Sequence, residues 1–92
     1  MIELVLYSRA DCELCREMEI VVEQEMARFE ARLEKIDIDG NPELKQRFDL
    51  EVPVLFVNGR KAFKYRCTPR ELRKRLSREV GRRWLFGKAP TA

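Results

Sequence analysis

The sequence predicts an α/β protein in which a four-stranded mixed sheet is flanked by three helices, in the order β-α-β-α-β-β-α. Two observations support this prediction. Short aliphatic segments, typical of buried strands, alternate with segments in which apolar residues recur every three or four positions. The dipeptide Asn58-Gly59 separates the last two strand-like segments and is the strongest short signal for a hairpin. Strands joined through a helix lie parallel and hairpin strands antiparallel, so the sheet is expected to be mixed.

The size of the chain bounds the domain organisation. Its 92 residues, 45% of them hydrophobic, can build one small core. We assign the domain to residues 1–86 and expect residues 87–92 to form a disordered tail. No apolar run is long enough for a membrane span, and the N-terminus lacks the pattern of a signal peptide. We therefore predict a cytoplasmic protein without membrane association, and separately we expect a monomer.

The first half of the chain carries the main chemical signal. Residues 2–7 form the first expected strand, and a loop over residues 7–11 leads to Cys12-Glu13-Leu14-Cys15. An amphipathic helix is expected from Cys12 to about Ala31. Two thiols three residues apart lie within one helical turn, so a disulfide between them can form and break with little backbone movement.

The position of the two cysteines predicts different roles for them. Cys12 would lie at the helix N-terminus, where unpaired N–H groups and the helix dipole stabilise a thiolate. Cys15, one turn further and facing the core, would be the resolving thiol. Buried structural cysteines and a metal site are the alternatives. Histidine is absent and there are three cysteines, so the chain offers few zinc ligands and we predict no metal.

The remaining elements follow from local signals. A second strand is expected over Leu33–Ile38, and a short helix from Pro42 to near Phe48, with Asn41 as its N-cap. A third strand over residues 54–57 precedes the hairpin, and a fourth runs from Arg60 to about Tyr65.

The last helix begins at a capping box, Thr68-Pro69-Arg70-Glu71. It is expected to present Leu72, Leu76 and Val80 on one face and to weaken or end at Gly81.

Three motifs in this order resemble the glutaredoxin branch of the thioredoxin fold. They are residues 7–15 (YSRADCELC), residues 36–44 (IDIDGNPEL) and residues 52–59 (VPVLFVNG). The resemblance implies a thioredoxin-like fold and a thiol-disulfide oxidoreductase with Cys12 and Cys15 as catalytic residues. It also implies a cis peptide bond before Pro53, which faces Cys12, and a substrate backbone held at Val52 and Pro53. Tyr7, Arg9 and Leu14 would shape the rim of the site.

The chain also departs from the family pattern. Common dithiol glutaredoxins have Pro-Tyr between the cysteines, where this chain has Glu13-Leu14, and their Gly-Gly element after the hairpin is replaced by residues 63–67 (FKYRC). The second difference counts against glutathione binding. The buried acid of thioredoxins is replaced by Leu6. The chain looks most like the small bacterial glutaredoxin-like proteins.

These features predict dithiol-disulfide exchange with a protein or small-molecule disulfide. The reductant would be glutathione or a thioredoxin-reductase-type enzyme, and no bound cofactor is needed. Cys67 could be an accessory thiol, with Lys61, Lys64 and Arg66 lowering its pKa, or a residue that packs at the start of the last helix.

The distribution of charge suggests a competing function. Residues 1–59 have a net charge of −7 and residues 60–92 a net charge of +10, which together give the +3 of the whole chain. The alternative is therefore a non-catalytic adaptor that binds an acidic protein or nucleic acid through the basic last helix, aided by Trp84, Leu85 and Phe86. Pairing of that helix with the acidic first helix, or exposure of the charges to solvent, is favoured over nucleic-acid binding.

Overall fold

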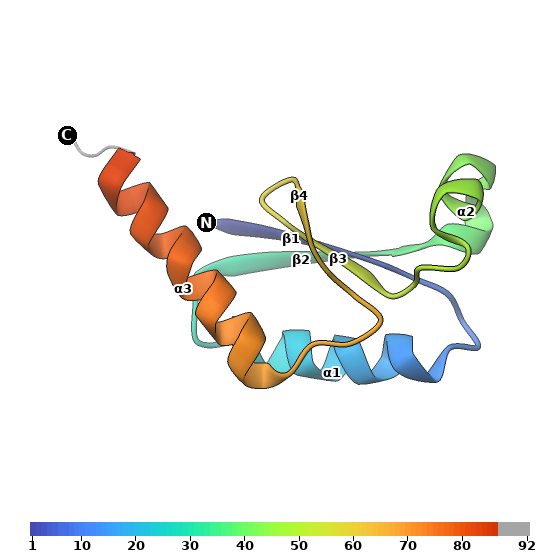
Figure 1. Ribbon diagram of the computed structural model, residues 1–92, viewed down its shortest axis with the longest axis horizontal. Coiled ribbons are helices and arrows are strands. Elements are labelled where there is room, and N and C mark those ends of the chain that lie inside the picture. The colour runs from blue at the N-terminus through green and yellow to red at the C-terminus, as the bar shows by residue number, and fades with distance from the viewer. Residues whose placement is uncertain (87–92) are drawn as a thin grey trace.

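A computed structural model describes residues 1–86 of the chain (Figure 1). Side chains are described as far as Gly81. The expected tail at residues 87–92 and the side chains of Trp84, Leu85 and Phe86 lie outside the described residues. The elements follow in the order β1 (Ile2–Ser8), α1 (Glu13–Met26), β2 (Ala31–Asp37), the short 3₁₀ helix η1 (Ile38–Gly40), α2 (Pro42–Phe48), β3 (Val54–Val57), β4 (Arg60–Lys64) and α3 (Pro69–Phe86).

The four strands form one mixed sheet in the order β2-β1-β3-β4, which confirms the predicted architecture. β1 and β2 are parallel, with Ile2 beside Ala31 at one end and Ser8 beside Asp37 at the other. β3 is antiparallel to β1 and to β4. Since β1 occupies a central position, the loop that follows it leaves from the middle of the sheet, and this loop carries the cysteines.

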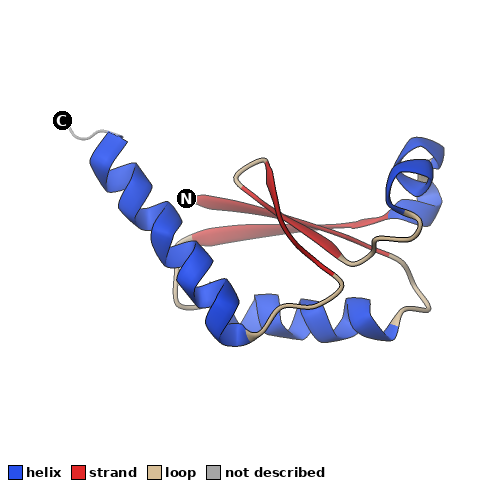
Figure 2. Ribbon diagram, in the orientation of Figure 1, coloured by secondary structure: helices blue, strands red, loops and turns tan. Residues whose placement is uncertain are grey.

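The helices cover the sheet on both sides. Figure 2 shows α1 along one side and α2 on the other, near the end of the sheet where β1 leads into α1. Alternate residues of β1, namely Ile2, Leu4 and Leu6, are at most 1% exposed and pack in a cluster with Leu72 and Leu76 of α3. Burial of one such side chain stabilises the fold by about 1.5–3 kcal/mol. A second cluster lies toward α2 and includes Cys15.

The turn and cap predictions are confirmed. The Asn41 side chain accepts hydrogen bonds from the backbone N–H groups of Glu43 and Leu44, at 3.0 and 3.2 Å. Asn58 and Gly59 have φ angles of 50° and 81°, as a tight hairpin turn requires.

The first helix is shorter than predicted. It ends at Met26 instead of Ala31, because the Arg28 N–H bonds the carbonyl of Glu25 and the Phe29 N–H that of Met26, which turns the chain toward β2. Phe29 still packs against the core, and so it extends the helical spacing of apolar residues beyond the helix. As a consequence β2 begins at Ala31, and Ile38 belongs to η1 instead of the strand.

The last helix is longer than predicted. The capping box at its start is confirmed: the Thr68 N–H donates to the Glu71 carboxylate at 2.9 Å, and the Glu71 N–H to the Thr68 hydroxyl at 3.1 Å. The helix does not end at Gly81, since one glycine costs only about 1 kcal/mol in a helix. Val80 is 48% exposed and not on the buried face, where Glu79 takes its place.

Candidate active site

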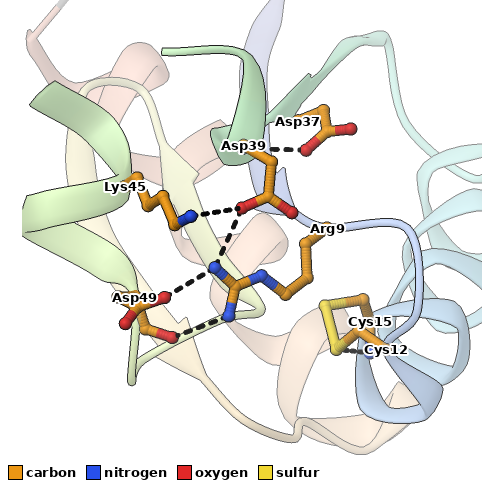
Figure 3. A network of polar contacts seen from close by, with 7 residues as sticks. All are labelled: Arg9, Cys12, Cys15, Asp37, Asp39, Lys45 and Asp49. Atoms are coloured by element: carbon orange, nitrogen blue, oxygen red, sulfur yellow. Dashed lines mark hydrogen bonds and ion pairs between the residues drawn. A yellow bond between two sulfur atoms is a disulfide. The ribbon is translucent and has the colours of Figure 1, made fainter. Parts of the chain in front are cut away.

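Cys12 and Cys15 form a disulfide at the start of α1, with their Cα atoms 5.2 Å apart (Figure 3). Cys12 is the N-cap residue of the helix and Cys15 lies in its first turn. Cys12 is half-buried, whereas Cys15 is only 3% exposed. The outer sulfur is therefore the one that a substrate can reach.

The sulfur of Cys12 takes the place of the usual capping oxygen. The backbone N–H of Cys15 donates a hydrogen bond to Cys12 Sγ at 3.1 Å, and the Cys12 carbonyl accepts from the Arg16 N–H at 3.2 Å. A helix N-terminus stabilises negative charge through its unpaired N–H groups and its dipole. The same donor would thus stabilise a thiolate on Cys12 once the disulfide opens.

A single apolar cluster surrounds the disulfide. Its buried members are Cys15, Ile38, Phe48, Val52 and Val54, and Tyr7, Cys12, Leu44 and Phe56 pack against it. The fold thus brings Tyr7, both cysteines and Val52 together in one cluster. The Val52–Pro53 peptide bond is cis and Pro53 is buried. Leu14 is half-buried and lies outside the cluster.

Tyr7 is fixed by two aromatic neighbours. Its ring stacks on that of Phe48 from α2, with centroids 4.8 Å apart, and meets Phe56 from β3 edge to face at 5.5 Å. The Tyr7 ring, which extends from β1, is therefore held by one residue of α2 and one of β3 beside the cysteine loop.

Arg9 is bound within the protein, although the sequence suggested only that it shapes the rim (Figure 3). Its guanidinium donates to the Asp49 carboxylate at 2.6 Å, to the Asp49 carbonyl at 3.2 Å and to the Asp39 carboxylate at 3.0 Å. The hydrogen bond to Asp49, and then that to Asp39, raise the pKa of Arg9 above its usual value. Lys45 lies 3.9 Å from Asp39. Arg9 thereby joins the cysteine loop to η1 and to the end of α2.

Sequence reasoning missed Asp39 and Asp49 as partners of Arg9. The available signal was weak, because Asp39 marked only the end of a strand and Asp49 only the end of a short helix.

The acid between the cysteines has a partner of its own. Glu13 forms an ion pair with Arg16 at 2.7 Å, and both side chains are largely exposed. The negative charge beside Cys12 is therefore opposed by a neighbouring positive one.

Cys67 lies in the other hydrophobic cluster, with Leu72 and Leu76, and is 8% exposed. Burial, with a smaller contribution from the charge of Glu71, raises the pKa of its thiol to about 11. Of the two alternatives for Cys67, an accessory thiol whose pKa is lowered by Lys61, Lys64 and Arg66 does not match this raised pKa. Packing at the start of α3 is the role that the geometry supports.

The acidic first helix and the basic last helix do pair, but at one point. The Arg73 guanidinium donates to both carboxylate oxygens of the buried Glu25, at 2.8 and 3.1 Å, and this hydrogen bonding lowers the pKa of Glu25. By contrast, Glu19 and Glu23 of α1 pair with Lys35 of β2. Among the described side chains of α3, Arg73 is therefore the one cation with an ion pair to α1.

The described residues contain neither a group of metal ligands nor a membrane-spanning helix. In that part of the chain, no three Cys, Asp or Glu residues are grouped so that they could hold a metal ion. No helix within it combines the length and the apolar character needed to cross a membrane.

The chain is similar to a known family of proteins. Residues 3–77 match the family described as glutaredoxin-like domain (DUF836). The chain belongs to this family. No protein of curated function matches it.

Solved structures of similar proteins have the same fold as this chain. A protein from X. campestris, XcR50, is 30% identical, with 82% of this chain and 96% of that chain covered and a TM-score of 0.70. Desulfothioredoxin from Desulfovibrio vulgaris Hildenborough, in its reduced form, is 28% identical over 84% of this chain and 80% of that one, with a TM-score of 0.66. Mitochondrial thioredoxin 3 from Saccharomyces cerevisiae is 17% identical over 84% and 77% of the two chains, with a TM-score of 0.64, and shares the fold. This glutaredoxin-like protein therefore has a thioredoxin-like fold.

Proposed function

We propose that this glutaredoxin-like protein is a thiol-disulfide oxidoreductase that works by dithiol-disulfide exchange through Cys12 and Cys15. The observation that carries the proposal is the disulfide at the N-terminus of α1, in which Cys12 is the accessible sulfur and accepts a hydrogen bond from the Cys15 N–H. Membership of the glutaredoxin-like family supports the same chemistry.

The reaction starts from the reduced protein. The Cys12 thiolate attacks one sulfur of a substrate disulfide, the substrate S–S bond breaks, and one substrate thiolate leaves and takes up a proton. Cys15 then loses its proton and attacks the Cys12 sulfur of the mixed disulfide. The second substrate thiol leaves, and the Cys12–Cys15 bond forms. Two electrons pass from the protein to the substrate.

The return step needs an external dithiol or thiol reductant. Glutathione or a thioredoxin-reductase-type enzyme would supply the two electrons that reopen the disulfide, and no bound cofactor takes part. Residues 63–67 in place of the Gly-Gly element count against a glutathione site on this chain. A reducing cytoplasm as the location and a monomeric state stay predictions.

The residues near the disulfide would contact the substrate or position the cysteine loop, according to where they lie. The main chain of Val52, beside Pro53, would pair with an extended substrate segment. Tyr7 and Leu14 would border the bound substrate. Arg9 is a positioning residue, because its guanidinium is occupied by Asp39 and Asp49.

A disulfide reduction assay tests the proposal. With dithiothreitol as reductant and insulin as substrate, the wild type and Cys67→Ser should turn over equally, while Cys12→Ser should be inactive. Cys15→Ser should accumulate a mixed disulfide with the substrate, which mass spectrometry detects. Turnover by Cys12→Ser at the wild-type rate would refute the proposed mechanism.

A further inference from the structure

A basic groove of about 510 Å³ lies between β4 and α3. One wall is Arg60–Phe63 of β4. The other is one face of α3, formed by Glu71, Lys74, Arg75 and Arg78, which recur at spacings of three and four. Glu71 is the one acid of this lining, and its carboxylate accepts a hydrogen bond from the Thr68 N–H at the start of the helix. No residue of this groove belongs to the apolar cluster around the disulfide. The groove is thus a second feature, independent of the proposed exchange chemistry.

Three of the cations in the groove have no ion-pair partner among the described residues. Lys61 is paired with Glu51 at 2.5 Å and Arg75 with Glu79. Their neighbours Arg60, Lys74 and Arg78 form no ion pair within the described part of the chain. These three exposed cations line a hollow whose remaining wall includes the half-buried Ala62 and Phe63. The groove is therefore suited to an anion with some apolar character.

The groove follows the free edge of the sheet. β4 is the last strand in the order β2-β1-β3-β4 and pairs with β3 alone within the described sheet. Successive side chains of a strand point to opposite faces, yet four consecutive residues of β4 line the groove, so the groove runs along the strand's edge. An edge strand presents unpaired N–H and C=O groups that can accept another strand.

The spacing of the cations matches an extended chain. Lys74 and Arg78 are one helical turn apart, which is about 6 Å along the axis of α3. Alternate residues of a β-strand are about 6.6–6.8 Å apart on one face. We propose that this groove binds an extended acidic segment of a partner protein, which adds to the edge of β4 and directs alternate carboxylates toward Lys74 and Arg78.

Two features favour a peptide over nucleic acid. The edge of β4 offers backbone hydrogen bonds, which a peptide backbone satisfies in full and a sugar-phosphate backbone does not. Single-stranded nucleic acid is typically held by bases stacked on open aromatic rings. The ring in this groove, Phe63, packs against the hydrophobic core instead.

The test is fluorescence anisotropy on the full chain with a labelled ten-residue peptide that alternates glutamate with threonine. Lys74→Gln/Arg78→Gln should weaken binding about tenfold, the combined effect of two exposed charge pairs. Arg66→Gln/Arg70→Gln removes two exposed cations outside the groove and serves as the matched control, with a change of less than twofold expected. Cys12→Ser/Cys15→Ser should bind as the wild type does, because the disulfide is not involved.

Two further probes separate the parts of the proposal. The same peptide with glutamine in place of glutamate should not bind, and a version N-methylated at alternate amides should bind more weakly, since it keeps its charge but cannot add as a strand. Equal losses in the two double variants would show a diffuse charge effect and overturn the assignment. It would also be overturned by absence of binding, by equal binding of the N-methylated peptide, or by tighter groove-dependent binding of a single-stranded oligonucleotide.

Discussion

The reactivity of Cys67 tests the electrostatics of the fold in a single measurement. When Cys12 and Cys15 are joined in the disulfide, Cys67 is the one remaining free thiol of the three cysteines. Its pKa rises from an ordinary 9.0 to about 11, chiefly because the thiol is buried. Each pKa unit changes the thiolate fraction tenfold at neutral pH, and the thiolate is the reactive form. Alkylation should therefore be about a hundredfold slower in the folded protein than in the unfolded chain.

The assay is alkylation by iodoacetamide at pH 7.4, followed by mass spectrometry, with and without denaturant. Glu71→Gln provides a matched variant: it removes the second cause of the raised pKa but keeps an oxygen that can accept from the Thr68 N–H. This variant should react faster than the wild type but well below the unfolded rate. A folded rate within about threefold of the unfolded rate would refute the argument from burial.

Three further outcomes follow from the structure. The pKa of Cys67 is near 9.0 in the unfolded chain and near 11 in the folded protein, so its protonated thiol contributes fully to the unfolding free energy below pH 9. This contribution is lost as the pH rises toward 11. Urea unfolding of the wild type should show this loss of unfolding free energy, and that of Cys67→Ser should not. Phe48→Ala removes a 2% exposed ring that supports Tyr7 and should cost about 3–5 kcal/mol of unfolding free energy, measured by urea denaturation. Arg9→Met should speed amide hydrogen exchange over residues 38–49, because the link from the cysteine loop to η1 and α2 is lost, while exchange in β3 stays unchanged.

Local signals were sufficient for most of the fold. The hairpin at Asn58-Gly59 and the caps at Asn41 and Thr68 depend on residues within a few positions of each other, and the structure confirms all three. The parallel pairing of β1 with β2 and the antiparallel pairing of β3 with β4 follow from general rules of chain connection, whereas the order of the strands across the sheet was not predicted.

The ends of the helices required tertiary information. Phe29 continues the apolar spacing of α1 but contacts the core from a turn, so spacing alone could not locate the end at Met26. Similarly, Glu79 and not Val80 lies on the buried face of α3, and its carboxylate accepts a hydrogen bond from Asn58 in the hairpin turn at 2.7 Å. That contact joins residues 21 positions apart and leaves no trace in local periodicity.

In the candidate site, too, features carried by neighbouring residues could be predicted and contacts between distant residues could not. The cysteine pair and its place at a helix start could be predicted, since four adjacent residues carry the signal. The partners of Arg9 could not, because Asp39 and Asp49 lie 30 and 40 residues away and meet Arg9 only in the folded chain. The sequence left two roles open for Cys67 for a similar reason: its charged neighbours are visible in the sequence, but the burial that raises the pKa of its thiol is not.

The reduction potential of the Cys12–Cys15 pair tests the central claim most directly. Cys67→Ser, equilibrated in glutathione buffers of graded ratio, contains only these two thiols, so the count of free thiols reports the pair alone. The proposed function predicts a reversible two-electron transition in the range of roughly −120 to −270 mV spanned by known dithiol oxidoreductases. A pair that forms no disulfide at any ratio, or that no reductant in this range can open, would contradict it.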